Sequence, residues 1–359
     1  MRFGICASTI DIPPSVNAWS ALRSIGVTDV RLTVDLTRLF PKEGEVKWGS
    51  VDSYVNPIRE AGLHIYMNPG GCPRWASEGF PAYEGLIVGN PDGTLGGTCF
   101  WNDPQHPDPN LIHFFDPNPK TNPQFAALDA QQPPRPYLID PPKMSAEFMY
   151  DAGFAIANRY KGIAAAFAIG NEYGGTVFYP PMRLDRIANE DNGTLDDVIR
   201  DRVFPEMVNP FTEGVRDANP WAVMVGCEAD SDIILERCCA LDAAKRVYDV
   251  LSFHPYGDLN NLGYATMEAF MKVVRARGNG RKAQVGEIGG DHAKLLTWAR
   301  ETIEKHGSEL DGIYFGEAST FFNAWPSAPT VSTVGEGFRN LFAQVNARRR
   351  AVRPLAEVA

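Results

Sequence analysis

Two glutamates stand just beyond short apolar stretches of the chain. Glu172 follows residues 164–169, and Glu287 follows residues 283–286. Short and largely apolar stretches are typical of parallel strands covered on both faces, so each glutamate is expected at the end of a strand. A carboxyl group among strand ends of low polarity has a perturbed pKa, which suits it to proton transfer or nucleophilic attack. Two such groups, one protonated and one ionised, match what hydrolysis of a glycosidic bond requires, although either alone could serve a structural ion pair.

Arg31 and His254 also lie on or beside apolar stretches. Arg31 interrupts residues 30–34, where a guanidinium needs a carboxylate partner. Beside Glu287 it would keep that carboxyl group ionised at neutral pH; alternatively, it pairs with Asp35 and serves structure alone. His254 could orient a substrate or a catalytic acid, or it could be a core histidine hydrogen-bonded to the backbone.

The elements that would hold these residues repeat regularly. Short apolar stretches alternate with amphipathic helical stretches eight times along the chain. Eight strand–helix units predict a closed parallel (β/α)₈ barrel, or TIM barrel, formed as a single catalytic domain by residues 1–359. A doubly wound open sheet is the alternative, but no Gly-x-Gly-x-x-Gly motif joins a strand to a helix. The expected strands are residues 3–6, 30–34, 64–67, 164–169, 222–226, 250–253, 283–286 and 313–315.

Residues 69–143 interrupt this pattern. They show little periodicity, are rich in Pro, Gly, Asn and Asp, and follow the third expected strand. We therefore expect a long loop insertion at the C-terminal rim of the barrel, where barrel active sites are built. Trp75 and Trp101 in this insertion, and Trp325 after the last strand, could stack on sugar rings, whose C–H faces are apolar. They could equally anchor the loops.

Four short motifs occur in barrel order. They are Arg31 on the second expected strand, Asn171-Glu172 after the fourth, His254-Pro255-Tyr256 after the sixth and Gly286-Glu287 after the seventh. Each motif alone is weak, but together they make the chain resemble the clan A glycoside hydrolases over nearly its whole length. This resemblance implies a TIM barrel with catalytic glutamates on strands four and seven.

The resemblance also implies a role for each residue. Glu172 would be the acid/base and Glu287 the nucleophile of a retaining, double-displacement reaction. Asn171 would bind the sugar hydroxyl beside the bond that breaks, Tyr256 would donate a hydrogen bond to Glu287, and Arg31 would hold its charge. The reaction would need no cofactor, because carboxyl groups and water suffice. The long insertion suggests a walled cleft, which favours an endo-acting β-glycanase that cleaves a poly- or oligosaccharide.

The end of the eighth expected strand departs from the clan pattern. Many clan members carry a tryptophan there as a floor for the sugar ring, whereas residues 314–317 read Tyr-Phe-Gly-Glu. Either Trp325 reaches back to the site or the floor differs in this protein.

A divalent-metal-dependent sugar isomerase or epimerase on a TIM barrel is the main alternative. Its candidate ligands for Mn²⁺ or a similar ion are Glu172, Glu228, His254 and Glu317. Nothing in this alternative requires Asn171 or Tyr256, so we expect a site without metal.

The composition limits the partners of the protein. Hydrophobic residues make up 44% and charged residues 22%, as in soluble globular proteins, and the formal net charge of -10 argues against nucleic acid. No apolar run is long enough to span a membrane, and no leader of the secretory type precedes the first strand, so localisation stays open. We expect a monomer. Cys72 and Cys99 share the insertion and either pair in an oxidising compartment or remain free thiols.

Overall fold

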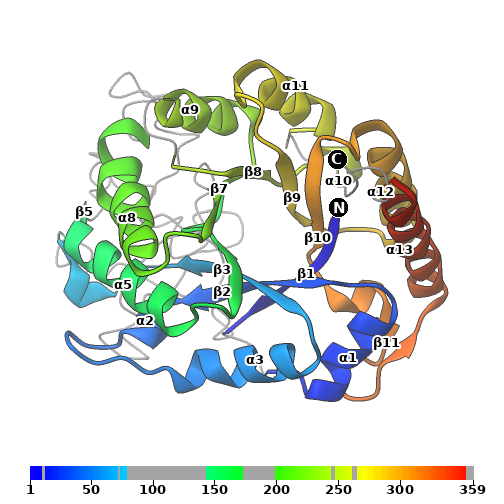
Figure 1. The fold of residues 1–359 in the computed structure, drawn as a ribbon, viewed down its shortest axis with the longest axis horizontal. Helices are drawn as coiled ribbons and strands as arrows, with labels where there is room; N and C mark the ends of the chain where they lie inside the picture. The colour runs from blue at the N-terminus through cyan, green and yellow to red at the C-terminus, as the bar shows by residue number, and fades with distance from the viewer. Residues whose placement is uncertain are drawn as a thin grey trace, which may run out of the picture.

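The computed structural model describes residues 1–9, 13–71, 73–78, 143–172, 199–243, 247–260 and 265–352. Eight parallel strands close into a barrel in the order β1-β10-β9-β8-β7-β6-β3-β2 (Figure 1). The predicted (β/α)₈ barrel is therefore confirmed, and all eight expected strands are present. The strands are β1 (Arg2–Ser8), β2 (Asp29–Asp35), β3 (His64–Gly70), β6 (Ala164–Phe167), β7 (Val223–Ala229), β8 (Val250–Phe253), β9 (Ala283–Ile288) and β10 (Leu310–Phe315).

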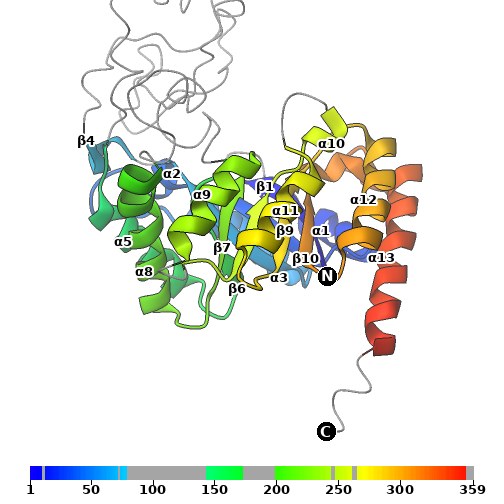
Figure 2. The ribbon, with the colours of Figure 1, turned by 90° about the horizontal axis from the view of Figure 1, so that it is seen from above.

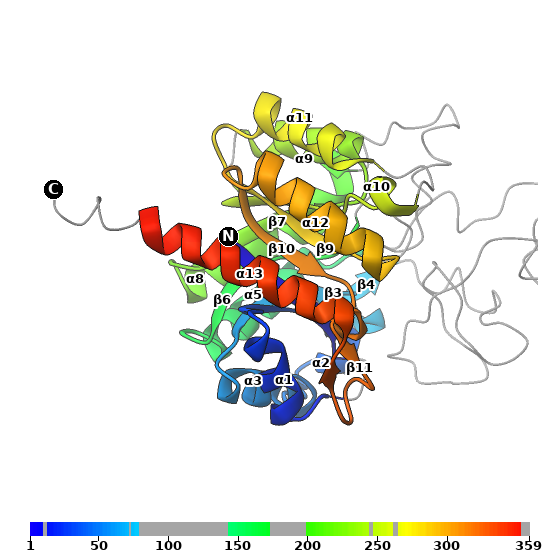
Figure 3. The ribbon, with the colours of Figure 1, turned by 90° about the vertical axis from the view of Figure 1, so that its right-hand side faces the viewer.

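Helices form an outer ring around the strands (Figure 1). The last two long helices, α12 and α13, lie side by side along one flank of the barrel (Figure 3). The helices are α1 (Val16–Ser24), α2 (Leu36–Leu39), α3 (Gly49–Glu60), α5 (Ala146–Arg159), the π-helical turn η4 (Ile199–Val208), α8 (Asn209–Ala218), α9 (Asp232–Asp242), α10 (Gly257–Asn260), α11 (Met267–Arg277), α12 (His292–His306) and α13 (Thr333–Val352). Two short 3₁₀ turns are η1 (Arg74–Ala76) and η5 (Ala318–Thr320). A small antiparallel pair is formed by β11 (Phe322–Asn323) and β12 (Thr330–Val331).

Strand β2 shows how the sequence directs side chains to the two faces of the barrel wall. Val30, Leu32 and Val34 are fully buried in the apolar layer between strands and helices. Since side chains alternate along a strand, Arg31 lies on the opposite face, toward the barrel axis. By the same alternation, polar side chains point into the barrel interior near the C-terminal ends of the strands.

The lower interior of the barrel is packed with aromatic side chains. The rings of Tyr66 on β3 and Tyr314 on β10 meet edge to face, with centroids 5.6 Å apart. Gly4 on β1 makes room for them, because a Cβ atom there would lie 2.1 Å from the Tyr314 ring. The barrel is thus closed below the level of the site.

Several helices begin at side-chain caps. Ser145 accepts a hydrogen bond from the backbone N–H of Phe148 at the start of α5, and Asp291 accepts two at the start of α12. Each cap accepts hydrogen bonds from backbone N–H groups that have no partner within the first helical turn. It stabilises the folded protein by about 1 kcal/mol. The caps fix where the chain turns from rim loop into helix.

The predicted insertion, residues 69–143, falls mostly outside the described residues. Its described edges meet, because β4 (Ser77–Glu78) pairs antiparallel with β5 (Lys143–Met144). Figure 2 places β4 and α10 at the same end of the barrel. The extent of the insertion and the single-domain organisation stay predictions, as does the pairing of Cys72 with Cys99, which are not described. In the described part of the chain, no helix has both the length and the apolar character needed to cross a membrane.

Candidate active site

The ends of two neighbouring strands are tied together at the barrel mouth. Glu172 follows β6 and Glu228 lies near the end of β7; both adopt left-handed backbone conformations, with φ of 48° and 50°. The N–H of Glu172 donates to the carbonyl oxygen of Glu228 at 2.8 Å. Such conformations are uncommon away from glycine and cluster at functional sites. This link directs the Glu172 side chain to the same space as the side chain of Glu228.

Glu287 is held as a carboxylate near the end of β9. Its Oε1 accepts a hydrogen bond from the Tyr256 hydroxyl at 2.6 Å, and its Oε2 lies 3.1 Å from Nη1 of Arg31. Burial alone would raise the pKa of Glu287, but the charges of Arg31 and His254 and the Tyr256 hydrogen bond lower it below its ordinary value. Both contacts are the ones that the sequence resemblance implies.

Arg31 connects three side chains of the mouth. Besides Glu287, its guanidinium contacts Glu228 at 3.1 Å and donates to Oδ1 of Asn171. Burial lowers the pKa of Arg31, but the neighbouring carboxylates outweigh this effect and hold it well above its ordinary value. The alternative pairing with Asp35 is wrong, because Asp35 caps α2 and lies 3.5 Å from Arg38.

His254 lies between two carboxyl groups. Its Nδ1 is 2.8 Å from Oε1 of Glu172, and its Nε2 is 2.8 Å from Oε2 of Glu228. Burial lowers the pKa of this imidazole, but the two hydrogen-bonded glutamates outweigh it and raise the pKa to about 10. At neutral pH the ring is therefore a cation that donates to both glutamates. The alternative prediction, that His254 is a core histidine whose ring is hydrogen-bonded to the backbone, is wrong, because both ring nitrogens contact carboxyl groups.

Glu228 and Tyr66 were missed as members of this network. Glu228 is fully buried and accepts hydrogen bonds from the Tyr66 hydroxyl and from His254. Burial would raise its pKa, but Arg31, His254 and Tyr66 outweigh it and lower the pKa to about 2. Sequence reasoning weighed Glu228 only as a metal ligand, although it stands two residues beyond an expected strand. Tyr66 lies inside an apolar run and gave no signal.

A further carboxyl group, that of Asp230, lies beside this network. Burial and the charge of Glu172 raise its pKa to about 6. Its Oδ1 is buried and has no hydrogen-bond partner among the described residues. A buried acceptor of this kind suits a hydroxyl donor from a ligand.

The four residues considered as metal ligands do not form a metal site. Both ring nitrogens of His254 face carboxylates, and Arg31 occupies one side of Glu228. Glu317 instead accepts from the Ser319 hydroxyl at 2.7 Å. Across the described ranges, no group of three or more His, Cys, Asp or Glu side chains is arranged to hold a metal ion. The donor set does not fit the isomerase alternative.

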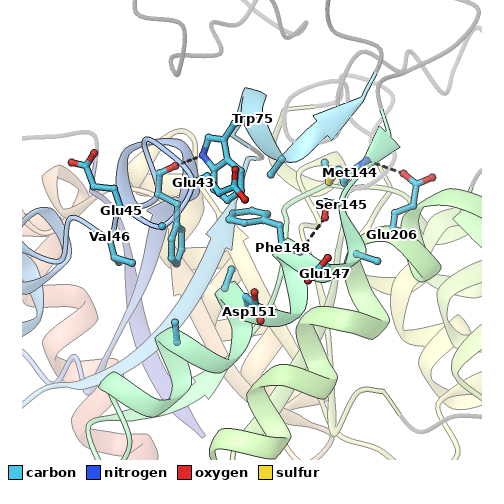
Figure 4. Close-up of a pocket in the computed structure, with 16 residues that line it drawn as sticks. Glu43, Glu45, Val46, Trp75, Met144, Ser145, Glu147, Phe148, Asp151 and Glu206 are labelled. Atoms are coloured by element: carbon cyan, nitrogen blue, oxygen red, sulfur yellow. Dashed lines mark hydrogen bonds between the residues drawn. The ribbon is translucent and has the colours of Figure 1, made fainter.

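Two of the tryptophans predicted to bind sugar, Trp75 and Trp325, are described, and both pack against aromatic rings outside the charged network. Trp75 is 38% exposed and donates its indole N–H to the carbonyl of Phe40 at 2.9 Å. It lines a separate pocket of about 770 Å³ beside the start of α5, where its ring meets Phe148 (Figure 4). Trp325 packs on Phe322 and Trp19, with centroids 5.7 and 6.1 Å away. Trp101 lies outside the described residues, and a sugar-binding role for all three stays a prediction.

The fold and the mouth together define a class of protein: a TIM barrel with carboxyl groups on neighbouring and facing strand ends, joined by buried cations. The structure brings together six of the predicted residues, while their catalytic roles remain predictions. The six are Arg31, Asn171, Glu172, His254, Tyr256 and Glu287.

Comparison with known proteins supports the fold, and does so through structure alone. No protein-family model matches the chain, and no curated protein matches it. Among solved structures, β-galactosidase from the psychrophilic Marinomonas ef1 has a TM-score of 0.55 at 14% identity; the match covers 98% of this chain and 60% of that chain. A glycoside hydrolase family 30 endoxylanase from Clostridium papyrosolvens has a TM-score of 0.52 at 12% identity, covering 96% and 70%. An endogalactoceramidase has a TM-score of 0.57 at 12% identity, covering 96% and 80%.

These structural neighbours are glycoside hydrolases of clan A, the group that the sequence motifs resemble. At 12 to 14% identity the likeness establishes the fold only. This chain spans 60% of the length of the β-galactosidase, so activity has to be argued from the site.

Proposed function

We propose that this chain is a retaining glycoside hydrolase that cleaves O-glycosidic bonds by double displacement. The observation that carries the proposal is the unequal support of two carboxyl groups at one barrel mouth. Glu287 is held ionised by Arg31 and Tyr256, whereas Glu172 lies against His254 and contacts neither of those groups in the described structure. This difference supports the proposal that Glu287 is the nucleophile and Glu172 the acid/base.

The first step forms a bond between Glu287 and the sugar. A carboxylate oxygen of Glu287 attacks the anomeric carbon, the glycosidic C–O bond breaks, and Glu172 gives its proton to the leaving oxygen. Arg31 neutralises the nucleophile in the free enzyme and fixes its direction. The Tyr256 hydroxyl binds Oε1 and the Arg31 guanidinium contacts Oε2, so both oxygens of Glu287 are held in position for the attack.

In the second step Glu172 acts as a base, and the ester between Glu287 and the sugar is hydrolysed. Glu172 is now a carboxylate and removes a proton from water, which attacks the anomeric carbon and breaks the ester to Glu287. The sugar leaves with its original anomeric configuration, and Glu172 regains its proton. Retention requires the two carboxyl groups to lie about 5–5.5 Å apart, close enough for direct attack.

The substrate class follows less directly. The chain's acidic balance favours a neutral carbohydrate over a polyanion, and the expected insertion favours a cleft for several sugar units. Two of the fold neighbours carry endo-acting enzyme names, an endoxylanase and an endogalactoceramidase. We therefore propose an endo-acting β-glycanase that works on a poly- or oligosaccharide as a monomer, without nucleic acid, membrane or cofactor.

A mechanism-based label tests the assignment. A fluorinated sugar with a good leaving group should add one sugar mass to Glu287, and NMR of the first product should show retained configuration. The variant Glu287→Ala should lose nearly all turnover even on activated substrates, since no leaving group replaces a nucleophile. Glu317→Gln, a rim carboxylate outside the network, is the matched control and should keep both label and turnover. An inverted product, or a label on another carboxyl group, contradicts the proposal.

A further inference from the structure

Five ionisable side chains form one continuous line across the barrel mouth. Oε2 of Glu287 meets Arg31 at 3.1 Å, and Arg31 meets Glu228 at 3.1 Å. Glu228 meets His254 at 2.8 Å, and His254 meets Glu172 at 2.8 Å. Acidic and basic side chains alternate along this line. The proposed nucleophile and the proposed acid/base are its two ends, and Glu228 is its centre.

We propose that Glu228 is a positioning residue that keeps this buried line electrically neutral in both steps of the reaction, by balancing the two cations that support the catalytic glutamates. The proposal rests on the proposed function. Glu228 itself is fully buried, so it acts through Arg31 and His254 and not on the substrate.

The charge count supports this role. Before attack, Glu287 is ionised and Glu172 carries a proton, so Glu287 and Glu228 balance Arg31 and His254. In the glycosyl-enzyme, Glu287 is a neutral ester and Glu172 is ionised, so Glu172 and Glu228 balance the same two cations. The line is neutral at both stages. Without the carboxylate of Glu228 it would carry one net positive charge at both, in a site where an unbalanced buried charge is costly.

The local structure is shaped around the Glu228 side chain. A Cβ atom on Gly286 would lie 2.4 Å from Oε2 of Glu228, so the residue before the nucleophile leaves space for this carboxylate. The Tyr66 hydroxyl satisfies Oε1 from below. The main-chain bond from Glu172 to Glu228 is independent of the side chain and should persist when the side chain is replaced.

The protonation state of the His254 ring is the property that should respond most directly to the charge of Glu228. The groups that act on its ring come from several elements: Glu172 after β6, Glu228 on β7, Asp230 after β7, Tyr256 after β8, and more distantly Arg31 on β2 and Glu287 on β9. With glutamine at position 228, His254 and Arg31 would share the interior without a carboxylate between them. The imidazole would then favour its neutral form and titrate between about pH 5 and 8.

The test is NMR of the ring nitrogens of His254 in the full chain, without substrate. In the wild type both nitrogens should be protonated at about pH 8, the upper end of the range where an ordinary histidine changes charge. In Glu228→Gln the ring should be neutral at that pH. Glu228→Asp, which keeps the charge, should retain a protonated ring at the same pH of about 8. Glu317→Gln should match the wild type. A neutral ring in the wild type, or identical behaviour of the Gln and Asp variants, overturns the proposal.

Kinetics provide the second readout. Glu228→Gln should lower kcat/KM on the order of 100-fold, at the low end of the contribution of general acid–base catalysis. The loss should be similar for activated and poor leaving groups, since both steps are affected. Unchanged turnover in Glu228→Gln overturns the proposal. Failure of the proposed function looks different: the wild type itself would cleave no glycoside while its His254 ring remained a cation. The wild-type NMR measurement still decides the electrostatic role if Glu228→Gln does not fold.

Discussion

Replacing Tyr256 with phenylalanine isolates the effect of one hydroxyl on the charge of Glu287. The hydroxyl donates to Oε1 of Glu287 at 2.6 Å, while the ring stands edge-on to His254 with centroids 6.2 Å apart. Phenylalanine keeps the ring and removes the donor. Arg31 still faces the other oxygen of Glu287, so Glu287 keeps its ion pair.

The structure sets the size and sign of the effect. A hydrogen bond to a charged group contributes about 1.5–3 kcal/mol, and about 1.4 kcal/mol corresponds to one pH unit. The pKa of Glu287 lies below its ordinary value, and this donor is one of the causes. Without it, Glu287 takes up a proton at higher pH. The acidic limb of the kcat/KM profile should move upward by about one to two pH units.

The assay is kcat/KM for an aryl glycoside measured between about pH 4 and 8, the range in which carboxyl groups control such profiles. Tyr150→Phe is the matched control, because it removes a hydroxyl bonded to Asp217 at 2.8 Å on the surface. The control should leave the profile unchanged. If Tyr256→Phe lowers the rate uniformly and leaves the acidic limb in place, the Tyr256 hydroxyl does not set the charge of the nucleophile.

Three further predictions concern other parts of the site. Glu172→Ala should reduce turnover most for substrates with poor leaving groups, because activated aryl glycosides need less protonation; equal losses across a leaving-group series would remove Glu172 from the acid/base role. Arg31→Met should lower the free energy of unfolding by about 3–5 kcal/mol in urea, because it strips a buried carboxylate of its partner. The exposed pair of Arg339 with Glu336 gives the control, and Arg339→Met should cost under about 1 kcal/mol. Turnover should survive treatment with a chelator, whereas loss restored by Mn²⁺ would favour a metal-dependent isomerase.

The fold could be predicted because the barrel strands carry a strong local signal. Stretches such as residues 250–253 are apolar and short, and the structure places β8 over the same residues. A carboxylate partner for Arg31 could also be anticipated, since a guanidinium in an apolar strand requires one and a TIM barrel brings strand ends together. The contact of Tyr256 with Glu287 was implied only by the resemblance to clan A.

The central role of Glu228 could not be read from the sequence. Its direction depends on an irregularity in the pairing of β7 with β8 between Gly226 and Ala229, and on a left-handed backbone at Glu228 itself. Neither follows from apolar periodicity, which describes regular strands only. The contact of Tyr66 with Glu228 could not be predicted either. The Tyr66 ring packs in the barrel core, and only its hydroxyl reaches the site.

The position of Trp325 shows a different limit. Its place in a rim loop was predictable, but the loop turns it toward Phe322 and the α1 side chain Trp19. Which neighbour an aromatic ring selects depends on loop conformation, and a composition rich in small and polar residues does not specify that conformation.

The main-chain bond between Glu172 and Glu228 has a consequence for how such an enzyme could diversify. The bond joins the end of the fourth barrel strand to the end of the fifth, so the backbone of Glu172 is anchored by β7 as well as by β6, at 2.8 Å. The described part of the chain just before Glu228 includes α8 and strand β7, whose buried residues belong to the core, so a change that shifts β7 would also shift the backbone of Glu172. Variation that preserves β7 and its packing should therefore leave Glu172 in place, so designs for altered specificity should keep both ends of this bond unchanged.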